Sequence, residues 1–288
     1  MTLDSYHAFA GVYDRLMADV PYEKWAARLD RDICEYGISS KIHQAGEQGE
    51  RIGSEDEPVT EDPGGQGERE SMLLESERNL VCDLGCGTGI ITRKLFDMGY
   101  DAFGVDVSAD MLSEAAMKDE GRGIMYLNQD ITELDLYSTI GTAVCICDSL
   151  NYLLSDDELE KAFKGVSNFL YPGGIFIFDC NTRYKYKEAI GDTTIAEDDG
   201  DVSFIWDNFY DETENVNECD LTLFIRRDDG LYERAEETHL QRGIDVSDIT
   251  QLSEKSGLEI VFIKDSDTEE NISETTERIY ACLKKNCK

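Results

Sequence analysis

The residues best suited to chemistry are concentrated in one stretch, 80–111. A short apolar run there contains Asp83, and three glycines follow at intervals of two residues: Gly85, Gly87 and Gly89. Glycine has no Cβ, so this segment can turn tightly and bring its backbone N–H groups close to a ligand. A second apolar run ends in Asp106, whose carboxylate can accept hydrogen bonds from the two hydroxyls of a ribose. The pattern predicts a cradle for a nucleotide-containing cofactor.

The residues around the glycines have the periodicity of a βαβ unit. Ile91, Leu95 and Met98 recur at helical spacing between the two apolar runs. An ordinary strand-to-helix turn with a glycine cap is the alternative that needs no ligand. A dinucleotide site would have glycines spaced G-x-G-x-x-G, so the observed spacing counts against a nicotinamide oxidoreductase.

With Asp83 ahead of the glycines, the pattern Asp-x-Gly-x-Gly-x-Gly resembles motif I of the class I S-adenosylmethionine-dependent methyltransferases. In that family the position of Asp106 binds the ribose, and an apolar residue near Met111 lies on the adenine. The position of Asp130 accepts from the adenine amino group, and the next backbone N–H meets the ring. The resemblance implies the following cofactor-binding residues: Asp83, Gly85, Cys86, Gly87, Asp106, Val107, Met111, Asp130, Ile131, Asp148 and Ser149.

The N-terminus resembles the helical cap of a bacterial branch of small methyltransferases. Its aromatic and apolar residues fall at helical spacing: Tyr6, Phe9, Ala10, Tyr13, Leu16 and Met17. A second helix is predicted after Pro21. In that branch the cap lies over the cofactor, which implies contacts from Tyr6 and Tyr13. The alternative is an aromatic stripe that serves only as core.

A second specific match lies at residues 143–153. An apolar run suited to a strand buried on both faces ends in Asp-Ser-Leu-Asn-Tyr-Leu, a recurrent form of motif IV in the same branch. The form Asn-Pro-Pro-Tyr, typical of enzymes that methylate nucleic acid bases or glutamine, is absent. Asn151 and Tyr152 could equally serve loop packing beneath the next helix.

The later elements complete a predicted α/β fold. Ser155 opens a helix with a capping box, and strand five follows at 175–179. The alternation indicates a Rossmann-like, doubly wound, mostly parallel seven-stranded sheet with helices on both faces. Three strands within 200–242 form an antiparallel meander, a candidate wall for the methyl acceptor. Its aromatic residues could contact an acceptor or belong to the core: Trp206, Phe209 and Tyr210.

Composition and net charge restrict the classes of partner that we expect the chain to bind. The chain has 62 acidic and 27 basic residues and a net charge of −35, so nucleic acid and membrane partners are not expected. Nine cysteines without a C-x-x-C pair, and only three histidines, indicate reduced thiols and no metal site. No secretory segment or long apolar span is visible, which favours the cytoplasm. We expect a helical cap at 1–43, a disordered insertion at 44–70 and a methyltransferase domain at 71–288.

The leading hypothesis is therefore methyl transfer from S-adenosyl-L-methionine to a small-molecule acceptor, with S-adenosyl-L-homocysteine as product. A non-catalytic module that only senses the cofactor is the alternative. A base is needed only where the acceptor must lose a proton, and His239 and Asp148 are conceivable bases. Neither has a partner in the sequence, so no catalytic residue is assigned. The pattern indicates neither the acceptor nor the oligomeric state.

Overall fold

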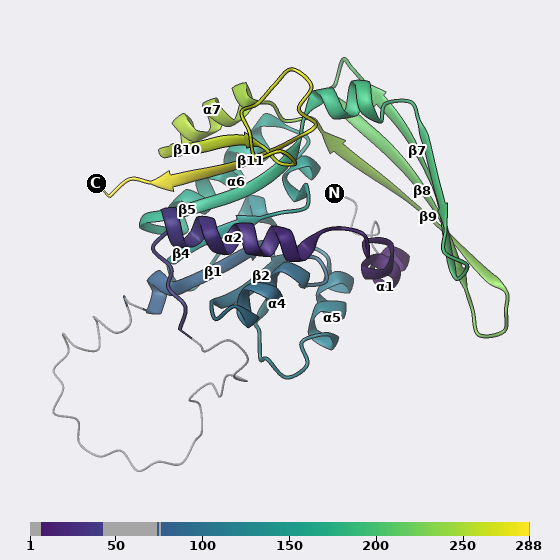
Figure 1. Cartoon of the computed structure of the whole chain (residues 1–288), viewed down its shortest axis with the longest axis horizontal. Helices are drawn as coiled ribbons and strands as arrows, with labels where there is room; N and C mark the ends of the chain where they lie inside the picture. Colours follow the sequence, from purple (N-terminus) through teal and green to yellow (C-terminus); the bar gives the residue numbers. More distant parts are fainter. Residues whose placement is uncertain (1–6, 43–73, 75, 288) are drawn as a thin grey trace, which may run out of the picture.

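The computed structural model describes residues 7–42, 74 and 76–287. Figure 1 shows a central sheet with helices on both faces and a second sheet at one end. Two helices come first, α1 (His7–Leu16) and α2 (Tyr22–Tyr36). Tyr6, the insertion expected at 44–70 and both of its boundaries lie outside the described residues.

The main sheet has seven strands in the order β10-β11-β5-β4-β1-β2-β3. The bounds are β1 (Leu80–Leu84), β2 (Asp101–Asp106), β3 (Tyr126–Asn128), β4 (Ile140–Cys145), β5 (Leu170–Asn181), β10 (Leu258–Asp265) and β11 (Arg278–Lys285). Strands β1 to β5 pair in parallel, and β11 is antiparallel to both of its neighbours. This confirms the predicted doubly wound, mostly parallel sheet. Strand β5 begins earlier than predicted, because Leu170 already pairs with Ile140.

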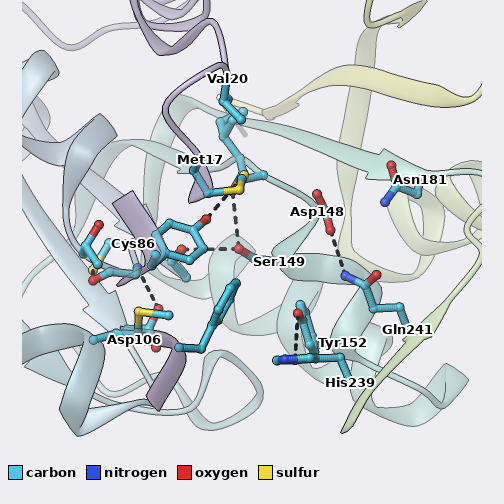
Figure 2. Close-up of a pocket in the computed structure, with 18 of the residues that line it drawn as sticks. Met17, Val20, Cys86, Asp106, Asp148, Ser149, Tyr152, Asn181, His239 and Gln241 are labelled. Carbon is cyan, nitrogen blue, oxygen red and sulfur yellow. Dashed lines mark hydrogen bonds between the residues drawn. The ribbon is translucent and has the colours of Figure 1, made fainter. Parts of the chain in front are cut away.

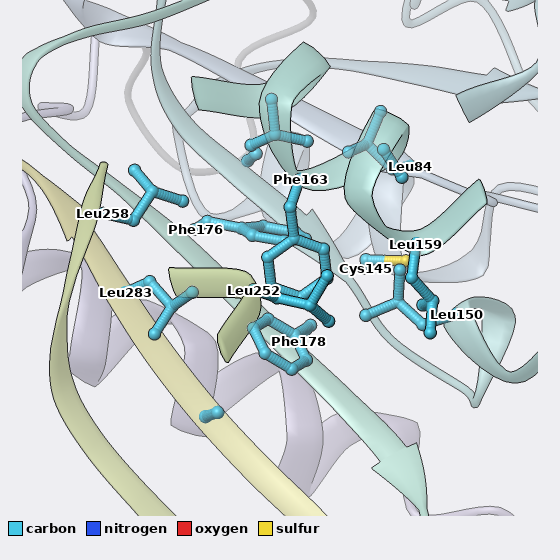
Figure 3. Close-up of a cluster of buried hydrophobic side chains, with 14 of the residues drawn as sticks. Leu84, Cys145, Leu150, Leu159, Phe163, Phe176, Phe178, Leu252, Leu258 and Leu283 are labelled. Atoms are coloured by element: carbon cyan, nitrogen blue, oxygen red, sulfur yellow. The ribbon is translucent and has the colours of Figure 1, made fainter. Parts of the chain in front are cut away.

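Helices cover both faces of this sheet because both faces are apolar. The helices between the strands are α4 (Ile90–Asp97), α5 (Ala109–Met117), α6 (Asp156–Phe169) and α7 (Val246–Ser256). Helices α2 and α4 form one apolar layer with the sheet, and α6 and α7 form the other. In Figure 3 the second layer is centred on Phe163, which packs against both Phe176 and Phe178. The predicted capping box of Ser155 and Glu158 is present at the start of α6.

A second sheet follows β5 and a short π-helical turn, η3 (Lys185–Ala189). Its antiparallel strands are β6 (Thr194–Asp198), β7 (Val202–Asp211), β8 (Val216–Arg226) and β9 (Tyr232–Arg242). The sequence predicted only the last three. All residues of β6 are exposed, so no alternation of apolar residues marks that strand in the sequence.

Helix α1 packs against the second sheet. An apolar cluster on the inner face of β8 consists of Cys219, Leu221 and Leu223. Helix α1 packs on this cluster through Phe9, Val12 and Leu16. In Figure 1, α1 lies between this sheet and helix α5. The carboxyl ends of the parallel strands thus face α1 and the second sheet. In the part of the chain described, no helix combines the length and apolar character needed to cross a membrane.

Candidate cofactor and acceptor site

A cavity of about 500 Å³ lies at the carboxyl ends of the parallel strands. Its walls come from the glycine loop, helix α1 and the inner face of the second sheet, and Figure 2 shows part of its lining. All predicted cofactor residues that the structure describes line it: Tyr13, Asp83, Gly85, Cys86, Gly87, Asp106, Val107, Met111, Asp130, Ile131, Asp148 and Ser149. The structure therefore brings together residues that are up to 136 positions apart in the sequence.

The glycine loop has the shape of a cradle. Gly85 and Gly87 have φ angles of +66° and +54°, in the left-handed region that favours glycine. A Cβ on Gly85 would lie 2.5 Å from Ser149 Oγ, whereas a Cβ on Gly87 would meet no atom within 4 Å. Gly85 is therefore required for close packing against the loop after β4. Gly87 leaves open the space that a ligand would occupy.

Two acids flank the glycine loop, the buried Asp83 and the half-buried Asp106, and both are hydrogen-bonded. Asp106 Oδ2 accepts from the Gly87 N–H and Oδ1 from the Ser108 N–H, each at 2.8 Å. Burial raises the pKa of Asp106, and these N–H donors oppose the rise. Burial also raises the pKa of Asp83 to about 7, although Thr92 donates a 2.6 Å hydrogen bond to it. Each oxygen of Asp106 keeps a lone pair that can accept from a ribose hydroxyl.

The side of the cavity expected to hold adenine contains Met111, Asp130 and Ile131. Asp130 Oδ1 accepts from both the N–H and the hydroxyl of Thr132, at 2.8 Å each. Because both bonds use Oδ1, Oδ2 can accept from a further donor. Gln129 and Thr132 also line this side and were not predicted from the sequence.

The loop after β4 has an unusual backbone conformation. Cys147 and Asp148 have φ angles of 71° and 52°, which non-glycine residues adopt only at a cost of about 1–3 kcal/mol. The Asp148 N–H donates to Asp179 Oδ1 at 2.8 Å, and Ser149 Oγ donates to the Gly85 carbonyl at 3.3 Å. The first bond ties the loop to β5, and the second ties it to the glycine cradle. Strain of this kind is typical of functional sites.

Asp148 is held as a carboxylate. Arg278 and Gln241 each donate to it at 2.7 Å, one to each oxygen. Burial opposes ionisation, but Arg278 and Lys185 outweigh it and lower the pKa of Asp148. With both oxygens engaged and a lowered pKa, Asp148 is a weak proton acceptor. The geometry therefore disfavours it as the base.

On the acceptor side, the structure separates the candidate aromatic residues. Trp206 lines the cavity, whereas Phe209 is 61% exposed and Tyr210 donates to Asn215, and neither lines it. His239 does line the cavity, and the Tyr152 hydroxyl oxygen lies 3.3 Å from His239 Nδ1.

Burial raises the pKa of Tyr13 well above its usual value, so this phenol stays protonated.

Asn151 has a structural role. It is fully buried and donates to the carbonyl groups of Asn181 and Arg242, at 2.9 and 2.6 Å. It also accepts from the Asn181 N–H at 2.9 Å. These bonds tie the loop after β4 to the ends of β5 and β9, in agreement with loop packing.

Around Asp148, sequence reasoning also missed three polar residues of the cavity: Lys185, Gln241 and Arg278. Arg278 begins β11, and only the pairing of β11 with β5 brings it to Asp148 and Asp179. Burial, and then the nearby Arg278, lower the pKa of Lys185. For Gln241 the sequence offered no apolar alternation, because the buried residues that alternate with exposed ones along β9 are polar.

The fold and the cavity together define a class of protein. A doubly wound sheet with a glycine loop after β1, an acid at the tip of β2 and a cavity over the carboxyl ends is a Rossmann-like architecture for a nucleotide-containing cofactor. Residues 81–174 match the family model of the methyltransferase domain.

Comparisons with known proteins extend this match to the whole chain. A relative from Geobacillus sp. (strain WCH70), assigned by name to the methyltransferases, is 30% identical over 283 residues, covering 98% of this chain and 100% of that protein. The crystal structure of a S-adenosylmethionine-dependent methyltransferase from Clostridium acetobutylicum ATCC 824 superposes with a TM-score of 0.75 at 28% identity, covering 98% and 99% of the two chains. The chain belongs to the S-adenosylmethionine-dependent methyltransferase family.

A more distant neighbour shares the fold alone. The sugar N-methyltransferase KedS8 from Streptoalloteichus sp ATCC 53650 has a TM-score of 0.58 at 14% identity, covering 82% of this chain and 99% of that one. The predicted enzyme class, a methyltransferase that depends on S-adenosylmethionine, is confirmed by these findings.

Proposed function

We propose that this enzyme binds S-adenosylmethionine in the half of the cavity around the glycine loop and methylates a small molecule in the other half. The observation that carries the proposal is the lining of the cavity. One continuous cavity has motif residues such as Asp106 on one wall and Trp206 and His239 of the second sheet on another. Its volume of about 500 Å³ is in the range of small-molecule sites.

The residues present fit this cofactor. Asp106 would hold the ribose hydroxyls, while Met111, Asp130 and the Ile131 N–H would hold the adenine. The open space at Gly87 gives the backbone of the loop room to approach the ligand. When bound, the cofactor supplies an electrophilic methyl group on a sulfonium. The protein's part is to align the acceptor and keep water out, and Tyr13 and Met17 from the N-terminal cap cover the cavity for this purpose.

Three further observations support a small-molecule acceptor in the cytoplasm. The net charge of −35 disfavours nucleic acid. The neighbour KedS8 acts on a sugar and has the same fold. All nine cysteines are free thiols, as expected for a reducing compartment.

Isothermal titration with S-adenosylhomocysteine tests the cofactor half of the proposal. Asp106→Ala removes the carboxylate at the tip of β2, and we expect a dissociation constant about 10- to 100-fold higher, since hydrogen bonds to charged groups are each worth about 1.5–3 kcal/mol. Asp101→Ala is the matched control, because Asp101 lies at the opposite end of the same strand and does not line the cavity. Absence of binding, or undiminished binding in Asp106→Ala, would refute the assignment.

Turnover of methyl-labelled cofactor with a panel of amines, alcohols and phenols tests the acceptor half. We expect methyl transfer to at least one class of small molecule. Tight binding of the cofactor with no transfer to the panel, but transfer to added protein or RNA, would contradict the small-molecule assignment.

A further inference from the structure

The inner face of β9 carries a row of buried polar residues. Glu237, His239 and Gln241 are two residues apart, so they lie on the same face of the strand. Their exposed fractions are only 8%, 7% and 6%. Gln241 is accounted for by its hydrogen bond to Asp148. Glu237 and His239 are not among the residues assigned to the cofactor, and buried ionisable groups beside a cavity are candidates for function.

These two residues form a chain with Tyr152 of the turn η2 (Ser149–Tyr152). His239 Nε2 lies 3.6 Å from Glu237 Oε2, and His239 Nδ1 lies 3.3 Å from the Tyr152 hydroxyl. Figure 2 shows the Tyr152 and His239 side chains next to each other, joined at the phenol oxygen. Tyr152 and His239 line the cavity and Glu237 does not, so the carboxylate lies behind the imidazole.

The other oxygen of Glu237 fixes its position. Glu237 Oε1 accepts from the Phe9 N–H at 3.0 Å, in the first turn of α1. A carboxylate near a helix N-terminus is stabilised by the unpaired N–H groups and the helix dipole. Phe9 also packs its ring against the His239 ring, at 5.7 Å between centroids. The cap helix thus holds both members of the pair in place.

The Glu237 carboxylate, 3.6 Å from Nε2, favours one of the two neutral tautomers of His239. A carboxylate can only accept, so it favours the tautomer with N–H on Nε2, facing Glu237. Nδ1 then carries the ring lone pair and accepts from the Tyr152 hydroxyl. The order carboxylate, imidazole and hydroxyl is that of a relay in which the hydroxyl at the cavity is activated through the imidazole.

Resting on the proposed function, we infer that Tyr152, backed by His239 and Glu237, takes the proton from an acceptor N–H or O–H group during methyl transfer. The acceptor's lone pair forms the bond to the methyl carbon, and sulfur keeps the electron pair of the bond that breaks. The acceptor's proton passes to the Tyr152 oxygen while the phenol proton passes to His239 Nδ1. One positive charge is lost at sulfur and one appears on the imidazolium, beside the Glu237 carboxylate.

The acceptor belongs to one chemical class, and the three residues have different roles. The acceptor is an amine or a hydroxyl compound that carries a proton at the methylated atom. Tyr152 is the catalytic residue because it meets the acceptor in the cavity. His239 and Glu237 are positioning residues that act through it.

Nitrogen-15 NMR of the histidine ring tests the pair without an acceptor. The full chain is labelled at histidine and bound to S-adenosylhomocysteine, and since it has only three histidines, His239→Asn assigns the signal. We expect the Nε2–H tautomer in the wild type and loss of this preference in Glu237→Gln, whose amide oxygen can still accept from Phe9. Glu236→Gln makes the same change on the opposite, exposed face of β9 and should keep the wild-type tautomer. An Nδ1–H tautomer in the wild type, or no change in Glu237→Gln, would overturn the inference.

Turnover tests the catalytic role. With an acceptor from the panel, Tyr152→Phe should lower kcat about 100-fold and Glu237→Gln about tenfold, while the affinity for S-adenosylhomocysteine stays within about twofold. Glu236→Gln should turn over like the wild type. Full turnover in Tyr152→Phe would refute the relay while leaving the proposed function intact. Loss of S-adenosylhomocysteine binding in the wild type would instead refute the proposed function.

Discussion

The burial of Asp83 should make the stability of this protein depend on pH in an unusual direction. Asp83 is 2% exposed, in the strand that leads into the glycine loop. Burial raises its pKa from 3.8 to about 7, against the 2.6 Å hydrogen bond from Thr92, and the neighbouring Asp106 adds to the rise. The folded state therefore binds a proton that the unfolded state has already released above pH 4.

The direction and size of this pH dependence follow from the linkage between proton binding and folding. Where the folded state binds more protons, the free energy of unfolding falls as pH rises, here between about pH 4 and pH 7. A shift from 3.8 to about 7 corresponds to about 4 kcal/mol in total, at about 1.4 kcal/mol per pH unit. About 2 kcal/mol of this is lost between roughly pH 5.5 and pH 8.5, because the folded state releases its proton only near neutrality.

Asp83→Asn removes the ionisation and keeps an oxygen that can accept from Thr92. Urea denaturation gives the free energy of unfolding of both proteins at each pH. We expect the value for Asp83→Asn minus the value for wild type to rise by about 2 kcal/mol between about pH 5.5 and pH 8.5. The control is Asp198→Asn, because hydrogen bonds from Ser203 and Gly200 lower the pKa of this exposed acid. It is ionised throughout this range, so its difference from wild type should stay constant. The same constancy for Asp83→Asn would refute the reasoning.

Three further predictions test the geometry of the site. Arg278→Leu removes the guanidinium that pairs with the half-buried Asp148 and the fully buried Asp179, and should lower the free energy of unfolding by about 3–5 kcal/mol in urea titrations; a loss under about 1 kcal/mol would contradict this. Gly87→Ala and Gly123→Ala both place a Cβ in open space at positive φ, so each should cost about 1–2 kcal/mol. Only Gly87→Ala should weaken S-adenosylhomocysteine binding in titration calorimetry, and equal affinities would count against the cradle. Asn151→Ala should lower stability by about 2–4 kcal/mol, because buried backbone groups lose their partner; an unchanged melting curve would argue against that role.

The residues on the glycine-loop side of the cavity were predictable because their contacts are local. The glycine loop, Asp106 and the cap of α5 lie within one βαβ unit, where a glycine pattern and an apolar periodicity are enough to place each residue. Asp130 and Asp148 were assigned from the resemblance to methyltransferase motifs, and the fold brings them to one cavity because each follows a strand of a parallel sheet, whose strands end at the same edge.

The acceptor side was less predictable because its contacts join distant segments. His239 had no visible partner in the sequence, although Glu237 lies two residues away on the same face of β9. Tyr152 reaches it only through the fold, from 87 positions earlier. The exposed strand β6 has no apolar pattern and was missed.

By itself, the sequence determined the parallel sheet, the glycine cradle and the methyltransferase family, because these depend on short-range patterns that each segment carries alone. Only the tertiary structure decided how charge is distributed in the cavity. Whether an aspartate is buried, paired with Arg278 or free to act as a base depends on which segments meet it, and these lie up to 130 residues away. The environment of a buried side chain, rather than its identity, sets its ionisation, so Asp83 and Asp148 differ in pKa although both lie beside the same cavity.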